Sequence, residues 1–99
     1  MEYICLVKRE NTAKAEEKLR KDFDLAAKQS ITIKDAKSAG TNLEGNIFFI
    51  RGSEEGVNHC KALLKEFVVS ASEAELKKAR TTILKEEENA AEGFGEIFG

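Results

Sequence analysis

The chain has little of the chemistry that most catalytic and metal sites require. His59 is the only histidine, so one chain cannot build a histidine-centred triad or a metal site with more than one imidazole. Eighteen Asp and Glu residues are present, but none is set among apolar residues in a way that would raise the pKa of its carboxyl group. We therefore expect a non-enzymatic protein with no catalytic residue, no metal site and no cofactor.

Cysteine is also scarce. The two cysteines, Cys5 and Cys60, are too few for a disulfide framework. Cys5 falls in an expected strand and Cys60 in the apolar stripe of an expected helix, where a thiol behaves as a small buried hydrophobe. Both are interpreted as core residues.

Long apolar runs are missing as well. No run approaches the roughly eighteen residues of a membrane-spanning helix, and residues 3–7 are too short and too early for the core of a signal peptide. A chain of 99 residues with 41% hydrophobic and 34% charged residues is typical of one soluble globular domain. We expect a cytoplasmic protein without a membrane partner.

Positive charge is not gathered in one part of the sequence. The densest basic stretch, residues 8–21, is diluted by three glutamates, and the second half of the chain is acidic. This distribution favours a solvated helix face over a nucleic-acid grip. RNA binding remains an alternative hypothesis, and its residues would be Lys14, Lys18 and Lys21.

Residues 46–68 contain a complete strand, turn and helix. Residues 47–50 read IFFI, an apolar run typical of a strand covered on both faces, and Gly52 ends it. Ser53 is a good N-cap for a helix that has glutamates in its first turn. The inner face of that helix should carry Val57, Cys60, Leu64, Phe67 and Val68.

The other elements are added to this unit. Residues 3–7 predict a second apolar strand, and residues 13–22 a helix whose inner face carries Ala15, Leu19 and Phe23. Residues 29–37 alternate as a half-solvated strand does, and residues 38–45 form a loose hairpin loop. Ser72 and Glu75 form a capping box that starts a third helix, which Gly93 ends.

These elements predict an α+β fold in β-α-β-β-α-α order. The third strand should lie between the first two in a three-stranded sheet, a split β-α-β arrangement equal to half of a ferredoxin-like fold. Two helices should cover one face of the sheet. The third helix with the C-terminal tail, or a second copy of the chain, should cover the other, and the first strand should be a long apolar edge. We expect a single domain over residues 1–91 and a tail over residues 92–99.

The tail carries the main functional signal. Residues 86–99 read EEENAAEGFGEIFG, a glutamate-rich segment without a basic residue, and Phe94, Ile97 and Phe98 recur at helical spacing. Together with Gly93 and Gly95, these residues resemble the tail of the archaeal ribosomal stalk protein, although residues 1–85 do not resemble that family. The resemblance implies a contact with a translation GTPase or the ribosome-recycling ATPase through the apolar side chains.

The leading hypothesis is therefore a small protein-binding module that docks a translation factor through this tail. There are two alternative interpretations of the tail: it folds back onto its own sheet, or it is a disordered end. A further alternative is a dimeric regulatory domain that binds a small ligand at its sheet or its dimer interface.

Overall fold

Four strands and three long helices make up the fold. The structure is a computed structural model that describes the backbone of residues 1–98 and the side chains of residues 1–90. In chain order the elements are β1 (Glu2–Val7), the 3-10 turn η1 (Arg9–Asn11), α1 (Thr12–Arg20), the 3-10 turn η2 (Ala26–Lys28), β2 (Ser30–Asp35), β3 (Asn46–Arg51), α2 (Glu54–Leu64), β4 (Val68–Val69) and α3 (Glu73–Phe98).

The strands form one antiparallel sheet in the order β2-β3-β1-β4. β3 pairs with β1 on one side, from Glu2 opposite Arg51 to Val7 opposite Asn46, and with β2 on the other. The predicted position of the third strand, between the first two, is therefore confirmed. Two β-α-β units, β1-α1-β2 and β3-α2-β4, interleave in this sheet.

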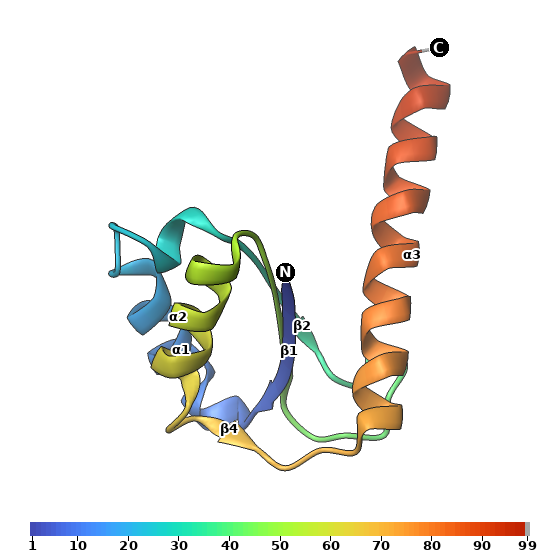
Figure 1. Cartoon of the computed structure of the whole chain (residues 1–99). Coiled ribbons are helices and arrows are strands. Elements are labelled where there is room, and N and C mark those ends of the chain that lie inside the picture. The colour runs from blue at the N-terminus through green and yellow to red at the C-terminus, as the bar shows by residue number, and fades with distance from the viewer. Residues whose placement is uncertain (99) are drawn as a thin grey trace.

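The first two helices cover one face of the sheet, as predicted (Figure 1). Phe48 and Ile50 point to this face from β3 and Cys5 and Val7 from β1, all of them buried, and they pack against α1 and α2. The helices contribute the buried residues Ala15, Leu19, Val57, Cys60 and Leu64. This cluster is the larger of two hydrophobic cores.

The third helix covers the opposite face. Leu6, Ile47 and Phe49 point to this side and pack against Ala79 and Ile83 of α3. The loop between β2 and β3 completes this core with Ala36 and Ala39, which are both fully buried. Figure 1 shows α3 crossing the sheet on the side opposite α1 and α2, with its last turns extending beyond the strands.

Several predictions about the elements are wrong in whole or in part. The sheet has a fourth strand, because residues 68–69, taken as the end of a helix and a break, pair with Leu6 and Val7 of β1. β1 is consequently an inner strand at Leu6 and Val7, and only Glu2–Cys5 keeps the predicted edge position. Phe23 is 74% exposed, because α1 ends at Arg20 and does not carry Phe23 onto its inner face. The backbone of α3 also continues past Gly93 to Phe98.

The predicted caps and turns are largely confirmed. The Ser53 hydroxyl accepts the Gly56 N–H at 3.0 Å, and the Ser72 hydroxyl accepts the Glu75 N–H at 3.1 Å. In the loop between β2 and β3, Gly40 has φ +83°, a conformation that favours glycine. At the start of α1, Asn11 makes no side-chain cap hydrogen bond, and η1 leads directly into the helix.

Candidate functional site

The tail residues with the strongest sequence signal fall outside the part of the chain whose side chains the structure describes. These residues are Gly93, Phe94, Gly95, Ile97 and Phe98. Their backbone belongs to α3. Whether residues 92–99 act separately from the domain over residues 1–91 stays a prediction.

The glutamates that precede the tail have structural partners on the sheet. Arg51 donates two hydrogen bonds to Glu87, at 2.6 and 2.9 Å, and Lys34 forms an ion pair with Glu86. The Arg51 guanidinium also lies 4.6 Å from the centre of the Phe49 ring. The hydrogen bonds from Arg51 lower the pKa of Glu87, so this carboxylate stays ionised at neutral pH. Glu86 and Glu87 therefore fasten α3 to β2 and β3.

The lysines of the RNA-binding alternative lie on or just after α1 and do not form an open basic patch. Lys18 forms an ion pair with Glu66 at 2.6 Å, and its ammonium lies 5.7 Å from the centre of the Phe67 ring. Lys21 pairs with Glu17 one turn earlier. Lys14 is exposed. Two of the three charges are thus shared with carboxylates.

His59 pairs with a carboxylate that the sequence did not connect to it. Its Nε2 lies 2.5 Å from Asp22 Oδ2, and Asp22 Oδ1 accepts the backbone N–H groups of Leu25 and Ala26 at 3.2 and 3.4 Å. The hydrogen bond with His59, helped by these N–H groups, lowers the pKa of Asp22. This arrangement holds the segment between α1 and β2 against α2.

The cysteines are unpaired and buried, as predicted. Burial raises the pKa of the Cys5 thiol to about 12 and also raises the pKa of Cys60. A thiol with such a pKa stays protonated at neutral pH and is a poor nucleophile and metal ligand. Over the residues whose side chains are described, no group of three His, Cys, Asp or Glu side chains is placed to hold a metal ion.

The glycine loop between β3 and α2 is filled by a side chain of the protein itself. Gln29 Oε1 accepts the Ser53 N–H at 3.1 Å, and Gln29 Nε2 donates to the Leu25 carbonyl at 3.0 Å. A Cβ at Gly52 or Gly56 would lie 1.9 or 2.1 Å from the Gln29 carboxamide. The two glycines therefore make room for Gln29, which docks the preceding loop onto the start of α2.

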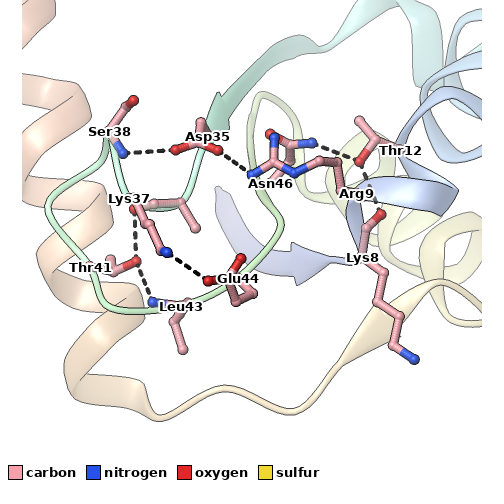
Figure 2. Close-up of polar contacts among 11 residues, drawn as sticks. Lys8, Arg9, Thr12, Asp35, Lys37, Ser38, Thr41, Leu43, Glu44 and Asn46 are labelled. Atoms are coloured by element: carbon pink, nitrogen blue, oxygen red, sulfur yellow. Dashed lines mark hydrogen bonds and ion pairs between the residues drawn. The ribbon is translucent and has the colours of Figure 1, made fainter.

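A polar network joins the loop between β2 and β3 to the start of α1 (Figure 2). Asp35 accepts hydrogen bonds from the Arg9 guanidinium at 2.5 Å and the Ser38 N–H at 3.0 Å. Thr12 donates to the Lys8 carbonyl and accepts from the Asn46 side chain at 2.9 Å. These hydrogen bonds join the loop to β3 and α1, so we interpret the network as structural support for the loop.

One groove combines apolar walls with basic side chains. It lies between α2 and the outer edge of β1, has a volume of about 490 Å³, and is lined by Tyr3, Asn58, Lys61, Ala62, Lys65 and Val68. The Lys61 ammonium lies 5.4 Å from the centre of the Tyr3 ring. The groove owes its shape to the shortness of β4, which sequence reasoning missed altogether. The sequence signal for β4 was the two adjacent valines, Val68 and Val69.

Comparison of the chain with family models, with curated proteins and with solved structures finds no match. Across the part of the chain that the structure describes, none of the helices is both long and apolar enough to cross a membrane.

Proposed function

We propose that the protein is a small binding module that presents its acidic, aromatic C-terminal segment to another protein. The contact residues are Phe94, Ile97 and Phe98. The resemblance of this segment to the stalk-protein tail makes a translation GTPase the first partner to test. No catalytic step is part of the proposal.

The observation that carries the proposal is that the sheet is covered without the tail. Ala79 and Ile83 of α3, with Ala36 and Ala39 of the preceding loop, close the second face of the sheet. Both faces therefore have their own hydrophobic core within residues 1–90. Each core is formed by residues of the described part of the chain, which supports a role for the apolar residues of the tail outside the domain.

The ion pairs of α3 support the same conclusion. Glu86 and Glu87 fix α3 to Lys34 and Arg51 just before the tail begins. These contacts hold the root of the segment in a defined place on the domain. A ligand segment presented from a fixed support loses less conformational freedom on binding than one at the end of a long linker.

The size of the tail sets the expected affinity. Burying two Phe and one Ile side chain contributes about 5–9 kcal/mol. Ordering a segment with three glycines costs about 1 kcal/mol or more for each residue. The remainder corresponds to a reversible contact with a Kd of about 1 μM or weaker.

The experiment compares the full chain with a variant that lacks residues 93–99, by surface plasmon resonance against a purified translation elongation GTPase. We expect the deletion to abolish binding and to leave the melting temperature nearly unchanged. Phe94→Ala should weaken binding strongly. The matched control is Phe23→Ala, which removes an exposed aromatic ring from another part of the domain.

Two results would contradict the proposal. One is equal binding by the full chain and the deletion variant. The other is a large fall in melting temperature on deletion, which would assign the tail to the folded core.

A further inference from the structure

The outer edge of β1 is covered only at its last two residues. β4 pairs with Leu6 and Val7 and then leaves the sheet at Ser70, so no strand within residues 1–98 lies beside Glu2–Cys5 on that side. A strand edge of this kind presents backbone donors and acceptors to another chain. The open stretch lies directly beside the groove between β1 and α2.

The pairing of β1 with β3 shows which backbone groups face this edge. Met1 and Gly52 exchange two hydrogen bonds, the Met1 ammonium to the Gly52 carbonyl at 2.8 Å and the Gly52 N–H to the Met1 carbonyl at 3.0 Å. In an antiparallel ladder such pairs alternate, so the next bonded pair is Tyr3 with Ile50. The N–H and C=O groups of Glu2 and Ile4 therefore point away from β3, toward the open edge.

The side chains beside this edge are apolar and basic. Tyr3 and Val68 form the apolar wall, and α2 supplies Lys61 and Lys65, both exposed. Neither lysine forms an ion pair with any side chain in residues 1–90. No carboxylate lines the groove.

On the opposite flank of the edge, the carboxylate of Glu2 is paired with a basic side chain of α3. Glu2 is the acidic residue of β1, and its carboxylate accepts two hydrogen bonds from Arg80 of α3, at 2.7 and 3.2 Å. An incoming acidic side chain would therefore meet basic groups from α2 on one side and a neutralised carboxylate on the other.

We propose that the open edge of β1 is a binding site for an extended, acidic segment of another protein, which adds to the sheet as a strand beside Glu2–Cys5, in line with β4. The backbone of Glu2 and Ile4 would supply the main-chain hydrogen bonds. Because side chains alternate along a strand, every second residue of the segment would face Lys61 and Lys65, which favours glutamate or aspartate at those positions. This site is separate from the C-terminal tail.

The edge at β2 does not offer the same chemistry. Its neighbouring crevice, between β2 and α3, is lined by Glu86 and Glu87, and the nearby Lys34 is paired with Glu86. An acidic strand at β2 would meet these carboxylates. The comparison assigns the acidic segment to β1.

The test uses the full chain and an acetylated seven-residue peptide in which valine and glutamate alternate. We expect saturable binding by nuclear magnetic resonance titration, with the largest shifts at the Glu2 and Ile4 amides and slower hydrogen exchange there. A peptide with lysine in place of glutamate, and one with a central proline, should not bind. Proline removes a main-chain donor, and lysine would be repelled by Lys61 and Lys65.

Two pairs of variants separate the parts of the site. Lys61→Glu with Lys65→Glu should weaken peptide binding about tenfold or more, whereas Lys14→Glu with Lys28→Glu, elsewhere on the surface, should not. Glu2→Pro should weaken binding more than Glu2→Ala. Both variants lose the contact with Arg80, but only proline removes the N–H group that faces the open edge.

Several outcomes would overturn the proposal. They are an absence of saturable binding, equal binding of the lysine peptide, equal binding by Glu2→Pro and Glu2→Ala, and shifts centred on the β2 amides of Ile31 and Ile33. A concentration-dependent dimer that protects the Ile4 amide would also overturn it, because the occupant would then be a second copy of this chain.

Discussion

The two faces of the sheet are sealed by different means. On one face α1 and α2 enclose large side chains from the strands, among them Phe48 and Ile50, in a single deep cluster. On the other face α3 and a loop enclose Phe49 with three alanines, Ala36, Ala39 and Ala79. The contact between α3 and the sheet ends in the ion pairs of Glu86 and Glu87 rather than in further apolar packing.

This difference shows how one helix and a loop can cover one face of the sheet while two helices cover the other. Small alanine side chains let the loop and α3 approach the sheet closely, so a narrow apolar stripe is enough to bury Ile47 and Phe49 completely. Charged residues then fix the position of the helix where the stripe runs out. We expect the face with two helices to carry more of the stability and the α3 face to respond more to its polar contacts.

Phe48 and Phe49 provide the most direct comparison, because they are neighbours on β3, point to opposite faces and are both fully buried. Phe48→Ala should lower the free energy of unfolding by about 3–5 kcal/mol, since it leaves a cavity beneath two helices. Phe49→Ala should lower the free energy of unfolding by about 3 kcal/mol, the low end of that range, because a single helix can move inward to fill the space. Urea denaturation measures both, and a larger loss for Phe49→Ala would reverse the comparison.

Ile83 tests the α3 side of the same contact. Ile83→Ala should lower the free energy of unfolding by about 2–3 kcal/mol, because the side chain is 97% buried but lies beside a crevice that water can enter. The control is Leu84→Ala, at a half-buried position on the same helix, which should lower the free energy of unfolding by less. If both variants unfold like the parent, α3 does not seal the sheet.

The ion pair at the end of the stripe should have a smaller effect. Glu87→Gln should lower the free energy of unfolding by about 0.2–1 kcal/mol at neutral pH, since the Glu87 side chain is 44% exposed. Its pKa is lower in the folded state than in the unfolded chain, so the contribution is present above the unfolded pKa. It is lost as the pH falls through the folded pKa. The parent and the variant should therefore converge in acid, and a constant difference would exclude the ion pair as the cause.

The smallest effect is expected on the face with two helices, at the contact between Asp22 and His59. Asp22→Asn should leave the global stability nearly unchanged and increase hydrogen exchange at Leu25 and Ala26, whose N–H groups Asp22 accepts. The pKa of Asp22 is lowered, so its stabilising effect is complete above the unfolded pKa and declines as the pH falls through the folded value. An equal rise in exchange throughout the domain would show that the contact is not local.

Patterns of apolar residues were enough to predict most of the fold. The run at residues 47–50 and the run at residues 3–7 have no polar face, so both were predicted to be strands of a sheet covered on both faces. The caps at Ser53 and Ser72 are local hydrogen bonds between residues three apart, and the sequence contains all of their parts. The inner stripe of α3 followed from its spacing.

The missed features all depend on contacts between distant residues. β4 has two residues, too few for an alternating pattern, and it is a strand because β1 lies beside it. The pairing of Asp22 with His59 joins residues 37 positions apart, and Gln29 fills a glycine loop more than twenty residues away. No spacing rule connects such positions.

The sequence by itself determined the order of the elements, the two apolar strands and the acidic, aromatic end of the chain, because each of these is a local property of composition and spacing. Only the tertiary structure decided that α3 closes the second face, that Glu86 and Glu87 bind the sheet, and that Glu2–Cys5 keeps an open edge beside two lysines. Those features arise when strands and helices pack together, and packing depends on which distant side chains meet.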